Sequence, residues 1–165
     1  MKDARSTENN VVRILGVIFF LMLAFFGSRI FAKGYASKLT QELTGQDMIR
    51  IQIKEEIISE NDAYELCKIG ISMDKANEKD LALAAFVRAT DLDKKYRDAW
   101  VLRGNLELKN DRPEEAITSL KKAEELDPIY PRTYELLATA YTAVGDEEQA
   151  KKAQEKWEYL KKTAE

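Results

Sequence analysis

Small and bulky residues recur with a period of 34 positions over the second part of the chain. The recurrence spans three blocks, residues 63–96, 97–130 and 131–164, and we number the offsets of each block from its first residue. Bulky residues stand at offset four, and small residues stand at offsets eight and twenty. A period of this length predicts pairs of antiparallel helices, a helix A and a helix B, that stack in an array over residues 61–164.

The small residues mark where the two helices of each block should touch, because helices approach closely only where side chains are small. These positions hold Gly70, Gly104 and Ala138 in helix A, and Ala82, Ala116 and Ala150 in helix B. Helix breakers fall between the two helices, at Asn77, at residues 111–113 and at residues 145–146. Each block is therefore predicted to be a helical hairpin.

These residues give the stretch its resemblance to tetratricopeptide repeats, together with Trp100 at offset four and the turn at residues 126–128. The resemblance covers about three fifths of the chain and implies an α-solenoid of three helical hairpins. The middle block departs from the family pattern, because Arg103 and Glu107 occupy offsets seven and eleven, which are usually apolar. Trp157 stands where the family prefers alanine, which predicts that the array ends with the helix over residues 147–162.

A second apolar segment, residues 11–32, follows a polar tail of residues 1–10. As a helix it would span about 33 Å, enough for the hydrocarbon core of a bilayer. A cleavable signal peptide is the alternative, but Arg29 and Lys33 lie between the uncharged run of residues 14–28 and a candidate cleavage site. We therefore expect an all-α fold in which one transmembrane helix precedes the solenoid.

The orientation of such an anchor is weakly marked, because basic residues flank both ends of the segment. A short polar tail before a first span more often stays cytoplasmic. The expected location is thus a single-pass membrane protein with its repeats outside the cytoplasm, on the periplasmic or cell-surface side. The alternative places the repeats in the cytoplasm.

Residues 33–60 form a linker whose apolar pattern fits two structures. Ile49, Ile51 and Ile53 alternate as in a strand, whereas Ile49, Ile53 and Ile57 follow a helical stripe. We favour a helix over residues 48–58, because it could cover the open end of the first hairpin. Gly45 and Asp47 should separate it from a shorter helix around residues 37–43.

Composition excludes several classes of chemistry. The chain has no histidine, so imidazole bases, histidine metal sites and the usual nucleophilic triads are absent. Its net charge is −3 with interspersed signs, which disfavours a nucleic-acid partner. The single cysteine, Cys67, reads better as a half-buried structural residue than as a reactive thiol. We expect no enzyme activity, no cofactor and no metal.

In the family, helix A lines a concave groove, and the resemblance implies that a protein or peptide partner binds there. The expected groove residues are Tyr64, Ile71, Lys75, Val101, Asn105, Leu108, Lys109, Arg132, Glu135 and Thr139. Family members that clamp a terminal carboxylate use four basic or amide residues. Here Cys67, Ile71 and Leu136 occupy three of those positions, and only Arg132 is compatible, so this clamp is not expected.

The function implied is a membrane-anchored adaptor or scaffold that binds a protein partner and supports assembly of an envelope or secretion complex. The alternative is a structural subunit whose repeats self-associate into a homo-oligomer through Trp157 and Tyr159. A purified array that stays monomeric over a broad concentration range would favour the adaptor.

Overall fold

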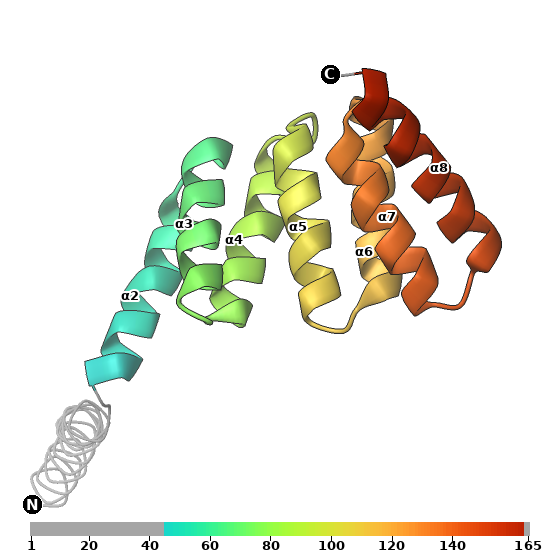
Figure 1. Cartoon of the computed structure of the whole chain (residues 1–165). Helices are drawn as coiled ribbons and strands as arrows, with labels where there is room; N and C mark the ends of the chain where they lie inside the picture. Colours follow the sequence, from blue (N-terminus) through green and yellow to red (C-terminus); the bar gives the residue numbers. More distant parts are fainter. Residues whose placement is uncertain (1–44, 164–165) are drawn as a thin grey trace, which may run out of the picture. The chain divides into compact units, whose positions relative to one another are not determined.

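The computed structural model describes residues 45–163, which form helices joined by short turns (Figure 1). The helices of this part of the chain are α2 (Gly45–Ser59), α3 (Ala63–Lys75), α4 (Lys79–Leu92), α5 (Arg97–Lys109), α6 (Pro113–Leu126), α7 (Pro131–Ala143) and α8 (Glu147–Thr163). From Ile51 onward, they belong to one compact unit.

The expected fold class, a transmembrane helix followed by six repeat helices, is wrong as stated. The described residues form a solenoid of seven helices, and none of these helices combines the length and the apolarity that a membrane crossing requires. The longest of them, α8, has 17 residues, fewer than a membrane-spanning helix usually needs, and it carries charged side chains along its length. The segment expected to span the bilayer, residues 11–32, lies outside the described residues.

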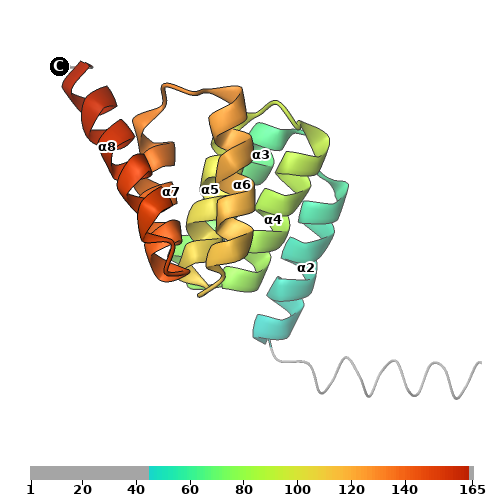
Figure 2. The same ribbon diagram turned by 90° about the vertical axis from the view of Figure 1, so that its right-hand side faces the viewer.

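Consecutive helices pair as hairpins, α3 with α4, α5 with α6 and α7 with α8 (Figure 2). Glycine allows this contact in the first two hairpins. A Cβ atom on Gly70 would lie 2.4 Å from Cε1 of Phe86, and one on Gly104 would lie 2.6 Å from Cγ of Leu120. The close approach therefore requires glycine at offset eight of both blocks.

The turn inside each hairpin has the same geometry. Asn77, Asp111 and Gly145 stand at offset fifteen with positive φ angles of 61°, 56° and 78°. The next residue donates its backbone N–H to a carbonyl five positions earlier, as in the bond from Glu78 N to Met73 O at 2.9 Å. Asparagine, aspartate and glycine tolerate this left-handed conformation best, so the sequence selects the turn.

The turns between hairpins are held by the bulky residue at offset four. Trp100 Nε1 donates to Lys94 O at 3.0 Å, and Tyr134 Oη donates to Pro128 O at 2.8 Å. Each bond ties the first turn of a helix A to the loop that precedes it. The position therefore serves two purposes, filling the core and fixing the loop.

The isoleucines at residues 49–57, whose pattern fits both a strand and a helix, lie on helix α2. Ile57 is 4% exposed and Ile53 packs against the same core as Leu66, whereas Ile49 is 58% exposed. The helix already begins at Gly45, so Gly45 and Asp47 lie within its first turn and do not precede it. Its inner stripe covers apolar surface of the first hairpin.

The two polar departures of the middle block form one buried network. Arg103 Nε donates to Glu107 Oε1 at 2.8 Å, and Ser119 Oγ donates to Glu107 Oε2 at 2.6 Å. Arg103 also reaches Oγ1 of Thr90 at 3.4 Å. Glu107 is only 2% exposed, and these bonds compensate its burial. The network joins α4, α5 and α6.

Candidate functional site

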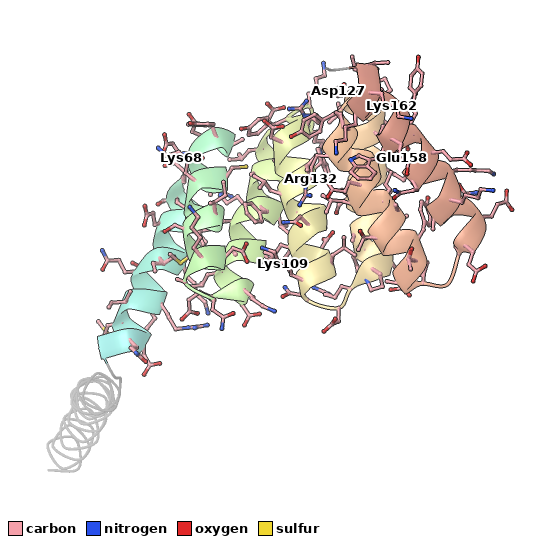
Figure 3. All side chains as sticks on the ribbon, viewed as in Figure 1. Lys68, Lys109, Asp127, Arg132, Glu158 and Lys162 are labelled. Atoms are coloured by element: carbon pink, nitrogen blue, oxygen red, sulfur yellow. The ribbon has the colours of Figure 1, made fainter. Side chains whose placement is uncertain are left out.

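A groove of about 440 Å³ runs along the side chains of α3, α5 and α7. Figure 3 labels two of its charged residues, Lys68 from α3 and Arg132 from α7. The groove is lined by Tyr64, Cys67, Lys68, Ile71, Tyr96, Asp98, Val101, Leu102, Asn105, Tyr130, Arg132 and Leu136. Helix A of every block therefore contributes to one continuous surface.

Three tyrosines stand along this surface, Tyr64 and Tyr96 from the first block and Tyr130 from the second. Tyr64 is 58% exposed, and Tyr96 and Tyr130 are half-buried at the ends of the loops that join the hairpins. The Arg97 guanidinium lies 3.8 Å from the centroid of the Tyr130 ring and 2.6 Å from Oδ2 of Asp127. This cation–π contact and ion pair hold the Tyr130 ring against the array.

Asn105 supplies an amide in the middle of the groove. Its side chain is half-buried on α5, and it makes no hydrogen bond within residues 45–163. The amide can donate two hydrogen bonds and accept two. A polar group in this position is therefore ready to bind a ligand that presents both a donor and an acceptor.

The charged groups of the groove already have partners. Lys68 lies 2.8 Å from Glu65, and Arg132 lies 2.7 Å from Glu135. Both pairs join residues three positions apart on one helix, and all four side chains are more than two-fifths exposed. Such exposed pairs add little stability, and they leave no strong net charge in the groove.

Cys67 belongs to the groove wall but is 3% exposed. Burial, helped by the Asp98 carboxylate, raises the pKa of its thiol to about 12. The thiolate is the nucleophilic form, so this cysteine is chemically quiet near neutral pH. It packs in the same core cluster as Leu66, against which Tyr96 also packs.

The structure brings together half of the groove residues expected from the sequence, namely Tyr64, Ile71, Val101, Asn105 and Arg132. The others, Lys75, Leu108, Lys109, Glu135 and Thr139, do not line it. Lys109 instead pairs with Asp74 at 2.6 Å, and Leu108 packs half-buried against the core around Leu137. Thr139 is exposed, and its hydroxyl donates a hydrogen bond to the backbone carbonyl of Glu135.

Two tyrosines of the groove were missed because they follow helix B and precede the next helix A. Tyr96 and Tyr130 occupy the last offset of the first two blocks, 34 residues apart. That repetition of an aromatic residue at the edge of helix A is the signal that could have identified them. Lys68 and Leu102, on helix A itself, were also missed.

Residues 98–130 and 131–163 each match the tetratricopeptide repeat family. Over 105 residues the chain is 31% identical to proteins named "Peroxisomal targeting signal receptor" from Komagataella phaffii (strain GS115 / ATCC 20864) and Komagataella pastoris. The matched segment covers 63% of this chain and 18% of each receptor. The chain therefore corresponds to a small part of these relatives.

Solved structures share the fold. The crystal structure of MamA superposes with a TM-score of 0.62 at 23% identity, over 68% of this chain and 66% of that one. The first tetratricopeptide domain of Spaghetti (RPAP3), solved with an HSP90 peptide, superposes with a TM-score of 0.59 at 22% identity. That match covers 60% of this chain and 79% of the RPAP3 domain.

Proposed function

We propose that this chain is an adaptor whose groove binds a short peptide segment of a protein partner. The proposal starts from the tetratricopeptide repeats over residues 98–130 and 131–163. Its solenoid is of a type typical of protein–protein interaction adaptors. The observation that carries the proposal is the unpaired amide of Asn105, which stands among the tyrosines and aliphatic side chains of a 440 Å³ groove.

An extended segment suits this groove better than a helix. The backbone of an extended peptide presents N–H and C=O groups without internal partners, and a single asparagine amide can bind one of each. A helix satisfies those groups internally and would leave the Asn105 amide without a partner. The volume of the groove is that of a pocket for a few side chains.

The side chains of the bound segment are expected to be apolar. Ile71, Leu102 and Leu136 offer aliphatic contact, and the tyrosine rings offer flat surfaces around them. Cys67, Ile71 and Leu136 stand at three of the four positions that a terminal-carboxylate clamp uses, so the groove lacks the set of cations that a terminal carboxylate would need. The ligand is therefore distinguished by its apolar side chains and its backbone.

The names of similar proteins support a binding role. One solved neighbour is the RPAP3 domain bound to an HSP90 peptide, and the curated relatives are named as receptors of a targeting signal. We propose a binding role without catalysis for this chain, because its sequence has no histidine to serve as a general base.

The test uses peptides selected by the full-length chain from a library displayed on phage. Asn105→Ala should weaken the binding of the selected peptides about tenfold, because the amide makes two hydrogen bonds in the complex. Thr139→Ala is the matched control, because Thr139 occupies the same offset on α7 but does not line the groove. Isothermal calorimetry measures both affinities.

Circular dichroism should show the same helical signal and nearly the same melting temperature for both variants. Peptides whose affinity is unchanged by Asn105→Ala, or is reduced equally by Thr139→Ala, would move the binding surface away from this groove.

A further inference from the structure

A second hollow, of about 280 Å³, lies between α6, α7 and α8, and we call it the α6–α8 pocket. Its floor on α7 is formed by Tyr134, Leu137 and Tyr141. The α7 residues of the groove are Arg132 and Leu136. At about 100° per residue the two sets stand on opposite faces of the helix, so the pocket and the groove are separate.

The same place one block earlier is filled by the chain itself. Leu137 and Tyr141 correspond to Arg103 and Glu107, which are 2.8 Å apart in the buried network, and Ala153 corresponds to Ser119. Leucine is shorter than arginine, and alanine lacks the hydroxyl of serine. The α6–α8 pocket therefore has leucine and alanine where the middle block has the paired Arg103 guanidinium and the Ser119 hydroxyl.

The rim of the pocket is also more basic than its counterpart. It carries Lys121, Lys152 and Lys156, whereas the corresponding residues one block earlier are Val87, Thr118 and Lys122. A single carboxylate, that of Glu124, lines the pocket with them.

The three lysines differ in how firmly a carboxylate of the chain holds each of them. Lys121 lies 2.8 Å from Glu124, and this contact raises the pKa of Lys121. Lys152 reaches to Glu148, but both side chains are at least 60% exposed, so this pair is easily exchanged. Lys156 has no carboxylate partner within residues 45–163, and its ammonium lies 5.9 Å from the rings of Tyr134 and Tyr159.

We infer that the α6–α8 pocket binds the carboxylate side chain of an acidic protein segment. Lys152 and Lys156 supply the positive charge, and the Tyr134 ring and Leu137 contact the methylene groups that precede the carboxylate. A bare inorganic anion would leave that apolar floor uncovered. The site lies opposite the groove, so the array can hold an acidic segment on one side and an apolar peptide on the other.

The test titrates the ¹⁵N-labelled full-length chain with a hexaglutamate peptide and follows the backbone amides by NMR. The amides of Leu137 and Ala153 should shift, while that of Asn105 stays in place. Lys156→Gln should weaken this binding about two- to fivefold, and K152Q with K156Q should weaken it further, because each removes one exposed charge. Lys122→Gln is the matched control at the corresponding position one block earlier.

A second variant closes the pocket without removing a lysine. The combined change Leu137→Arg, Tyr141→Glu and Ala153→Ser copies the Arg103–Glu107–Ser119 network of the middle block into the hollow, and it should abolish the peptide-induced shifts. Equal weakening by K122Q and K156Q would overturn the inference, because it would show that any surface lysine suffices. Inorganic phosphate that shifts the same amides equally at matched ionic strength would also overturn it.

Discussion

Arg103 and Glu107 lie one turn apart on α5 and satisfy each other inside the array, with 2.8 Å between Nε and Oε1. Arg103 also faces the Trp100 ring, with 5.6 Å from the guanidinium carbon to the ring centroid. The pair replaces two apolar residues that the last block keeps as Leu137 and Tyr141. Its charges are compatible with burial only while both are present.

We predict that Arg103→Leu alone lowers the free energy of unfolding by about 3 kcal/mol, because the Glu107 carboxylate stays buried without its cation. The triple variant Arg103→Leu, Glu107→Tyr and Ser119→Ala copies the residues of the last block, and it should return to within about 1 kcal/mol of the parent chain. Urea unfolding at pH 7 measures both. A single variant as stable as the parent would show that the pair contributes nothing.

The contact between α5 and α6 gives a second prediction. Gly104→Ala should lower the free energy of unfolding by about 1 to 3 kcal/mol, because the new Cβ would lie 2.6 Å from Cγ of Leu120 and 3.3 Å from the backbone oxygen of Ala116. Gly45→Ala is the control, since no atom lies within 4 Å of the Cβ that it would add. Thermal unfolding followed by circular dichroism compares the two. Equal melting temperatures would mean that the hairpin can open to admit a methyl group.

Thr133 on α7 offers a stabilising change. Its side chain is fully buried, and its Oγ1 has no hydrogen-bond partner in the described part of the chain. Thr133→Val keeps the shape and removes the unpaired hydroxyl, so the free energy of unfolding should rise by about 1 kcal/mol. The corresponding residue one block earlier is the buried Ala99, which shows that the position accepts an apolar side chain. A loss of stability in chemical denaturation would reveal a partner for the hydroxyl.

The resemblance to tetratricopeptide repeats is confirmed. It could be recognised because the hairpin contacts and turns require particular residue types at fixed offsets. Gly70 and Gly104 are required by steric contact, and Asn77, Asp111 and Gly145 by backbone conformation, so each constraint acts on a single residue. Arg103 and Glu107 stand out in the sequence as two separate departures from an apolar pattern, and that pattern does not predict that they pair. Their spacing of four residues on one helix is the signal that would have predicted the ion pair.

The candidate groove was only half predictable for a related reason. Family offsets locate the residues of helix A but do not say how deep each one lies. Leu108 was expected in the groove and packs on the core, whereas Tyr130 comes from a loop that the offsets of helix A do not cover. Depth depends on the neighbouring block, which a single repeat does not encode.

Titration of Cys67 and Tyr134 predicts a loss of stability in alkali. Burial raises the pKa of Cys67 from 9.0 to about 12, and burial together with Glu124 raises the pKa of Tyr134 from 10.0 to about 12. Unfolding returns both groups to their lower values. Their contribution is thus fully present below pH 9 and is lost as the pH rises toward 12.

The unfolding free energy should therefore fall between pH 9 and pH 11, and Cys67→Ala should make that fall shallower. At pH 8 the Cys67 thiol should react with iodoacetamide roughly a thousandfold more slowly than a free cysteine, because so little thiolate is present. Mass spectrometry of the alkylated chain gives the rate. Rapid alkylation of the folded chain would show that the thiol is ionised or open to solvent.

The contact between Arg97 and Tyr130 has a consequence for how tightly the groove can bind. Arg97 lies 3.8 Å from the centroid of the ring and is itself anchored by Asp127, so the tyrosine is oriented before any ligand arrives. Ordering a free side chain on association costs about 0.5 to 1.5 kcal/mol. A ligand that packs on Tyr130 avoids most of that entropic loss, so a small contact area can still give useful affinity.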